Sequence, residues 1–96
     1  MPDIRIERYH SLGKESAKRS VDGLARQLKA TLNATCDWYG DEMVIRSSGA
    51  DGRINVSDTQ VVIEVTLSMM LSPMKSTIER EINRQLETRL GTGKGG

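Results

Sequence analysis

The residue types that most often do chemistry occur once each in this chain, as a single histidine, His10, and a single cysteine, Cys36. A general base or metal ligand needs partners, and no cluster of Cys, Asp or Glu stands at metal-ligand spacing from His10. A thiol nucleophile needs a base, and the sequence offers Cys36 no second cysteine or paired histidine. We therefore expect His10 to have a capping or turn role, in preference to acting as a base or ligand, and Cys36 to be a small core residue.

Two further patterns share some residues with functional motifs but do not match them. Residues 91–94, Gly-Thr-Gly-Lys, contain parts of a phosphate-binding loop, but that motif is G-x-x-x-x-G-K-[ST] between a strand and a helix, and here a helix precedes it. Glu79 and Glu81 stand beside Arg80 and Arg84, which is typical of a solvated helix face. The sequence therefore predicts no catalytic residue, no metal site and no cofactor, and we expect a protein that is not an enzyme.

One passage is unusual: residues 68–74 read Ser-Met-Met-Leu-Ser-Pro-Met. The simpler interpretation is that flexible methionines fill the end of the core. The functional interpretation is that the methionines form an adaptable apolar surface for a partner, a lipid or a polymer. On that interpretation the candidate binding residues are Met69, Met70, Leu71 and Met74.

The elements that would position these residues are predicted from hydrophobic periodicity. Residues 61–67, Val-Val-Ile-Glu-Val-Thr-Leu, alternate as a central strand with one apolar face. Shorter alternations predict strands at 3–8, 35–39, 43–46 and 53–57. The turns between the last three of these strands and the central strand, including one at the Asp-Gly pair of residues 49–52, are short enough to force antiparallel neighbours.

Apolar residues at three- and four-residue spacing predict amphipathic helices over 14–32 and 72–90. Gly23 within the first helix predicts close approach to the sheet. The expected boundary residues are Ser11 and Ser72 as N-caps, Pro73 at the first position of the second helix, and Asn33 and Gly91 at the two ends.

The order β-α-β-β-β-β-α favours an α+β fold with two layers, an antiparallel sheet carrying both helices on one face. Residues 1–91 are expected to form a single domain, and residues 92–96 a disordered, Gly-rich tail. The opposite face of the sheet should be largely polar. The predicted core includes Ile63, Val65, Ile54, Trp38, Leu28, Ile82 and Leu86.

Composition excludes several classes of protein. A net charge of +1 with interspersed signs gives no basic footprint for nucleic acid. No stretch is long and apolar enough for a membrane span, no signal-peptide core is present, and a lone cysteine suits a reducing compartment, so we expect a cytoplasmic protein. A sheet with an open face and an exposed edge strand also predicts a weak homodimer.

Several passages together resemble the polyhydroxyalkanoic acid system protein family, also called polyhydroxyalkanoate granule-region proteins. The passages are Ile4-Arg5-Ile6 before His10-Ser11-Leu12, Ala17, the glycine turn Gly49-Ala50-Asp51-Gly52-Arg53-Ile54, and Leu71-Ser72-Pro73-Met74 before Ile78-Glu79-Arg80-Glu81-Ile82. The resemblance spans about residues 4–90. It implies a bacterial protein associated with storage-polyester metabolism, with the granule surface or other system proteins as partners, and it carries over no catalytic residue.

Three functions follow as hypotheses. The first, which the resemblance favours, is a non-enzymatic accessory protein associated with the granule. The second is a small helix-grip-like carrier that holds a hydrophobic acyl ligand between sheet and helices, although such pockets need roughly 300 Å³ or more. The third is an enzyme acting on hydroxyacyl groups, which the lack of a nucleophile–base pair argues against.

Overall fold

Five antiparallel strands form one sheet in the computed structural model, which describes residues 2–90. The strands are β1 (Ile4–Tyr9), β2 (Thr35–Tyr39), β3 (Glu42–Arg46), β4 (Ala50–Val56) and β5 (Gln60–Leu67). Their order across the sheet is β1-β5-β4-β3-β2, so the first strand of the chain pairs with the last. Residues 61–67 therefore lie inside the sheet, as expected, but β4 and not β5 occupies the middle position, because β1 takes the outer place beside β5.

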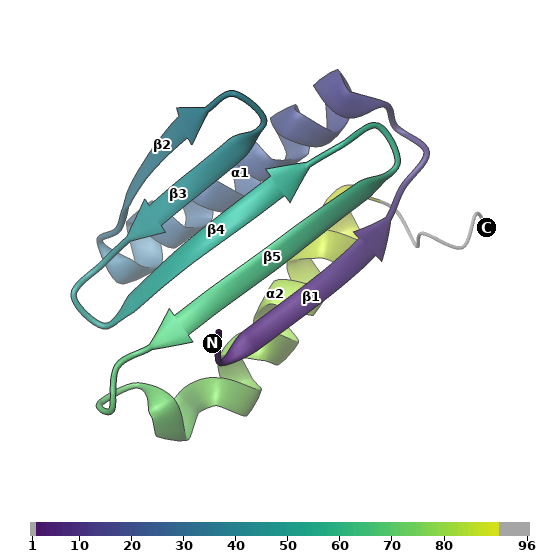
Figure 1. Ribbon diagram of the computed structural model, residues 1–96. Helices are drawn as coiled ribbons and strands as arrows, with labels where there is room; N and C mark the ends of the chain where they lie inside the picture. The colour runs from purple at the N-terminus through teal and green to yellow at the C-terminus, as the bar shows by residue number, and fades with distance from the viewer. Residues whose placement is uncertain (1, 91–96) are drawn as a thin grey trace.

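Both helices cover the same face of this sheet, and the other face is left open (Figure 1). The helices are α1 (Lys14–Leu32) and α2 (Lys75–Leu90), the latter preceded by the short 3₁₀ helix η1 (Ser72–Met74). α1 packs on β4 and β2, α2 packs on β1, and the helices contact each other. The predicted two-layer α+β fold and the order β-α-β-β-β-β-α are confirmed.

The core lies between the two layers and follows the predicted alternation. Inward residues of β1, β3, β4, β5 and both helices form one buried cluster, and Cys36 and Trp38 of β2 pack against it. Of the predicted core residues, Ile54, Ile63, Ile82 and Leu86 are buried, and Leu28, Trp38 and Val65 are half-buried against them. In the sheet, Ile63 pairs with Ile6 of β1 and Ile54 of β4, which places three isoleucines side by side under the helices.

Several boundary predictions need correction. The N-cap of α1 is Gly13, with φ of 82°, and not Ser11; an aspartate from a distant turn takes over the capping, as described below. Ser72 is not an N-cap either: it is the first residue of η1, its hydroxyl donates to the carbonyl of Ser68 (3.1 Å), and α2 begins at Lys75. Asn33 ends α1 as predicted, in the left-handed conformation with φ of 55°. The predicted end at Gly91 and the tail lie outside the described residues.

Two glycine predictions also change. The turn before β4 is made by residues 47–50, where the N–H of Ser47 donates to the carbonyl of Ala50 (2.9 Å), so Gly52 lies within the strand. Gly23 allows close approach to α2 and not to the sheet. A Cβ there would lie 2.4 Å from Nη1 of Arg89, so the arginine side chain occupies the space that the glycine leaves.

We expect Ile63→Asp to unfold the protein. The new carboxylate would be buried among Ile6 and Ile54 with no partner, and a cost above about 4 kcal/mol is much of the stability of a small domain. Circular dichroism and thermal melting measure this. Glu64→Gln, at the next and outward-facing position, is the control and should cost less than about 1 kcal/mol. Equal effects of the two variants would contradict the two-layer arrangement.

Candidate functional site

His10 closes the turn that follows β1. Its Nδ1 accepts a hydrogen bond from the N–H of Leu12 (3.2 Å), and its Nε2 lies 3.0 Å from the carbonyl oxygen of Ser57. Because Nδ1 accepts from an N–H, the ring proton lies on Nε2, which donates to that carbonyl. The ring is buried and both of its nitrogens are used within the fold. His10 therefore has the turn role that we expected from its place in the sequence.

Cys36 packs against the core beside α1. Its Sγ lies 3.9 Å from the carbonyl oxygen of Ala25, and the residue is half-buried. Burial is the main cause that raises the pKa of the Cys36 thiol, so the thiol stays protonated at neutral pH. A protonated thiol is a poor nucleophile, and this arrangement is that of a core cysteine.

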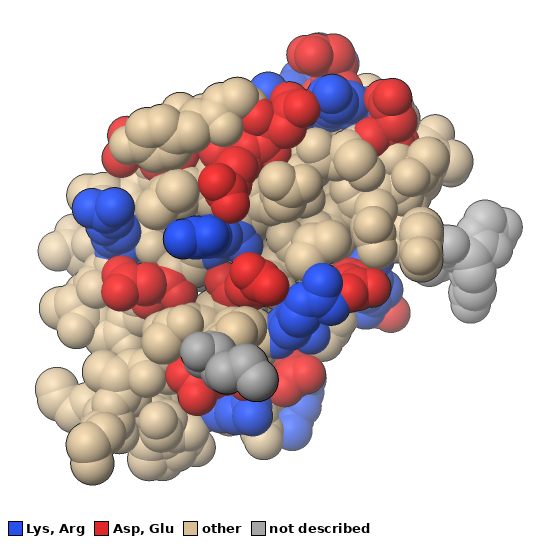
Figure 2. Space-filling view, in the orientation of Figure 1, with Lys and Arg blue, Asp and Glu red and all other residues tan. Residues whose placement is uncertain are grey.

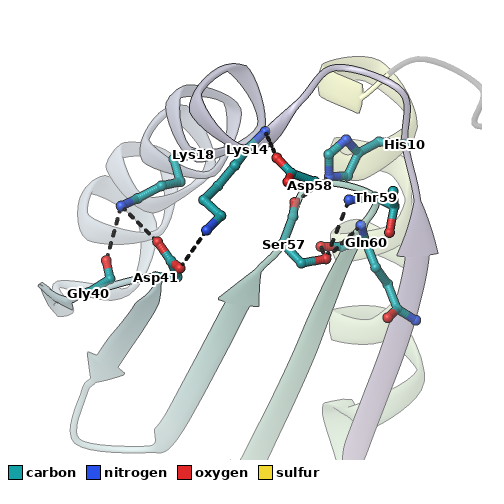
Figure 3. A network of polar contacts seen from close by, with 9 residues as sticks. All are labelled: His10, Lys14, Lys18, Gly40, Asp41, Ser57, Asp58, Thr59 and Gln60. Atoms are coloured by element: carbon teal, nitrogen blue, oxygen red, sulfur yellow. Dashed lines mark hydrogen bonds and ion pairs between the residues drawn. The ribbon is translucent and has the colours of Figure 1, made fainter.

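Charged residues gather at one end of the molecule, where the start of α1 meets two turns (Figure 3). Lys14 and Lys18 reach from α1 to the carboxylate of Asp41 in the β2–β3 turn, at 3.0 and 3.4 Å. Lys18 also donates to the carbonyl of Gly40 (3.0 Å). Asp58, in the β4–β5 turn, accepts the backbone N–H of Lys14 (3.2 Å) and so caps α1. These contacts tie α1 to both turns.

The pKa shifts at this end have the direction expected of ion pairs. The hydrogen bond from Lys14, with further contributions from Lys18, lowers the pKa of Asp41, and the same pair raises the pKa of Lys14. The lowered pKa makes the Asp41 carboxylate a weaker base, and the raised pKa keeps Lys14 protonated, whereas a general base needs a carboxyl pKa raised towards neutrality and a nucleophilic amine needs a lowered pKa. The cluster stabilises the fold, and its geometry offers no group poised for proton transfer.

We expect the stabilisation by Asp41 to be lost in acid. Since its folded-state pKa lies below the unfolded value, its contribution is fully present above the unfolded pKa and is lost as the pH falls through the folded pKa. Urea unfolding at several pH values should show Asp41→Asn weaker than wild type at neutral pH and the two converging in strong acid. Asp37→Asn, on the exposed side of β2, is the control for the loss of one carboxylate, and it should change the stability at neutral pH less than Asp41→Asn does. If the two variants behaved alike, the Lys14–Asp41 pair would not be formed in solution.

The open face of the sheet carries charges of both signs (Figure 2). Arg5 of β1 pairs with Glu64 of β5 (3.3 Å) and also with Glu7 on its own strand. A groove of about 620 Å³, open to solvent, runs over β3, β4 and β5 on this face. The outward side chains along it are Val44, Arg46, Asp51, Arg53, Glu64 and Thr66. The mixture of acids and bases is typical of a solvated sheet face.

The methionine turn, which we define as residues 68–74, lies at the opposite end from the lysine–aspartate cluster. Met69 is 92% exposed, Met70 82% and Met74 47%. In Figure 2 the corner of the molecule where this segment follows β5 carries no charged atoms on the visible side. The structure therefore favours the surface interpretation for these three methionines, and core filling does not describe them.

Leu71 behaves differently from the methionines and anchors the turn. Its side chain packs against the core, and a Cβ at Gly49 would lie 2.5 Å from its Cδ1, so a larger residue at the β3–β4 turn would force the Leu71 side chain to shift. Of the four candidate binding residues, three point outward and Leu71 points inward.

Backbone hydrogen bonds hold the methionines outward. The N–H of Ser68 donates to Gly49 (2.9 Å), and the carbonyl of Ser68 accepts the N–H groups of Leu71 (3.0 Å) and Ser72 (2.9 Å). Met69 and Met70 are therefore the two central residues of a closed β-turn, where side chains project away from the chain on both sides. Their exposure is built into the fold, because the residues before and after them are fixed.

The sequence offered no signal for the contacts that fix this turn or the other end of the molecule. Gly49 and Leu71 are far apart in the chain, as are Lys14 and Asp58, and each pair meets only because the sheet folds. The predicted homodimer stays a prediction: β1 and β2 are the outer strands of the sheet, and the structure contains a single chain.

We expect Leu71→Ala to destabilise the protein by about 1–2 kcal/mol, since a half-buried anchor is lost, and Met70→Ala to change stability by less than about 0.5 kcal/mol. Chemical denaturation of the two variants measures the difference. A Met70→Ala cost equal to that of Leu71→Ala would mean that Met70 is packed into the fold.

Within residues 2–90, no group of three or more His, Cys, Asp or Glu side chains is placed to hold a metal ion. None of the helices in this part of the chain is long and apolar enough to cross a membrane.

These features define a class of protein: a small α+β fold with an antiparallel sheet, two helices on one face, and an apolar turn held outward at one end. The sequence profile of the polyhydroxyalkanoic acid system protein family matches residues 4–90, and the chain belongs to this family. No curated protein and no solved structure matches the chain.

Proposed function

We propose that this chain is a non-enzymatic accessory protein of the storage-polyester system that adsorbs reversibly to the apolar surface of cytoplasmic polyester granules through the methionine turn. The observation that carries this proposal is the exposure of Met69, Met70 and Met74 on one ordered turn. Membership of the polyhydroxyalkanoic acid system protein family supports an apolar polyester as the surface.

The energy available suits reversible adsorption. Burying Met69 and Met70 against an apolar surface is worth roughly 3–6 kcal/mol together. Loss of translational and rotational freedom on binding offsets about 4 kcal/mol or more of this. The balance is a weak contact that forms and breaks readily. Methionine also suits a polymer surface with no fixed shape, because its unbranched thioether chain adapts to irregular contours.

The charges near the turn favour an uncharged apolar surface over an anionic membrane. Lys75 and Arg80 of α2 are exposed, but Arg84 is paired with Glu81 through two hydrogen bonds, and the net charge of the chain is only +1. A membrane-binding surface of similar size would need a cluster of several basic residues to add electrostatic affinity. Adsorption here depends on apolar contact.

The carrier alternative has less support. The layer between sheet and helices, where a helix-grip carrier would hold its acyl ligand, is filled by the buried side chains of the core. The groove of about 620 Å³ lies on the other face and is lined partly by charged residues, which suits an acyl chain poorly. An enzymatic role has no observation in its favour among the described residues.

We expect the triple variant Met69→Ser, Met70→Ser, Met74→Ser to keep its fold and to lose granule binding by at least about tenfold, since 1.4 kcal/mol of lost apolar transfer is already a factor of ten. Co-sedimentation with purified granules measures the bound fraction, after circular dichroism has established the fold of each variant.

The matched control is Tyr9→Ser, Leu12→Ser, Tyr39→Ser, which removes three exposed apolar side chains at the other end of the molecule. This control should bind as wild type does. Binding that survives in the methionine variant, or that is lost equally in both, would contradict the proposal. Phospholipid vesicles form the second arm: if wild type bound anionic vesicles as strongly as granules, the surface would be a membrane.

A further inference from the structure

The methionines of the turn have a chemical property that leucine, isoleucine and valine side chains lack. The thioether sulfur of an exposed methionine reacts with peroxides to give a sulfoxide, which is polar and chiral. Leucine, isoleucine or valine would supply similar apolar area on this turn without that reactivity. The three methionine side chains of the turn therefore supply both the proposed apolar contact and the sulfur atoms that can be oxidised.

We propose that Met69 and Met70 are an oxidation site that releases the protein from its apolar surface, with Met74 as a slower third position. This inference rests on the function proposed above. A peroxide transfers one oxygen atom to the sulfur: the O–O bond breaks, an S–O bond forms, the thioether is oxidised by two electrons, and hydrogen peroxide leaves as water. The reverse step returns the thioether and water when two thiols are oxidised to a disulfide, as in methionine sulfoxide reductases.

Exposure makes the reaction selective within one chain. Met69 is 92% exposed and Met70 82%, whereas Met43 of β3 is 1% exposed in the core. Cys36, the one cysteine, is half-buried with its pKa raised, which keeps it in the less reactive thiol form. Peroxide should therefore reach the sulfurs of the turn long before it reaches those of the core.

The structure also separates oxidation of the turn from damage to the fold. The turn is held by backbone groups of Ser68, Leu71 and Ser72, by the Ser68–Gly49 hydrogen bond and by the Leu71 anchor. None of these contacts uses the side chain of Met69 or Met70. A sulfoxide at either position changes the polarity of the surface and leaves every contact that positions it in place. The reaction is therefore suited to reversible control of binding.

The experiment treats the full chain with hydrogen peroxide, follows each methionine by peptide mass spectrometry, and measures granule co-sedimentation and circular dichroism on the same samples. We expect Met69 and Met70 to oxidise about tenfold or more faster than Met43, the fold to be retained, and the bound fraction to fall as it does in the triple serine variant. Treatment with methionine sulfoxide reductases and dithiothreitol should restore binding.

The matched variant is Met69→Leu, Met70→Leu, Met74→Leu, which keeps the apolar area of the turn together with Met1, Met43 and Cys36. It should bind granules as wild type does and stay bound after peroxide. Unchanged binding of wild type with both turn methionines oxidised, or equal loss of binding in the leucine variant, would overturn the oxidation site. Failure of untreated wild type to bind would instead overturn the proposed function, and the release step with it.

Discussion

The pairing of β1 with β5 is the constraint on which the rest of this structure depends. It joins the first strand to a strand more than fifty residues later, from Ile4 opposite Val65 to Tyr9 opposite Gln60. Because β1 leads into α1 and β5 leads into η1 and α2, this pairing lets both helices cover one face and lets α2 pack on β1. It also completes the inner face, since Ile4 and Ile6 join the buried cluster. The N-terminal segment reinforces the pairing where β5 ends: the carboxylate of Asp3 accepts the N–H of Leu67 (2.7 Å).

The same arrangement gives the molecule two unlike ends. At one end, the start of α1 is fixed by Asp41 and Asp58, whose charges compensate two lysines and a helix N-terminus. At the other end, the chain leaves β5 through a turn that is fixed by Gly49 and Leu71 and presents methionines to solvent. At the first end, polar contacts of fixed geometry hold the start of α1 against the two turns. Flexible apolar side chains at the second end suit contact with a surface of no fixed shape, which is what the proposed adsorption requires.

Much of the candidate site was predicted from local sequence, and the reason differs for each residue. His10 was expected in a turn because it follows a short alternating strand, and its two ring hydrogen bonds agree. Cys36 was expected to be a small core residue because no partner for thiol chemistry accompanies it, and it packs against the core beside Trp38. The helix starts were wrong at Ser11 and Ser72. In each case a serine stands a few residues before the apolar pattern of the helix, where an N-cap is expected. At the first helix Asp58 accepts the N–H of Lys14 instead, and at the second the hydroxyl of Ser72 donates to the carbonyl of Ser68.

By itself the sequence determined the type and order of the elements, because periods of two and of three to four residues assign strands and helices from neighbouring side chains alone. It also determined which face of each element is apolar. The passages that resemble the polyhydroxyalkanoic acid system protein family indicated the family to which the chain belongs. Only the tertiary structure decided which apolar side chains of the methionine turn pack against the core and which are exposed to solvent. Leu71 and Met70 are adjacent and similar in hydrophobicity, so no local pattern separates them. Leu71 is partly covered because Gly49, brought there by the β4–β5 pairing, leaves space for it, whereas Met69 and Met70 point to solvent.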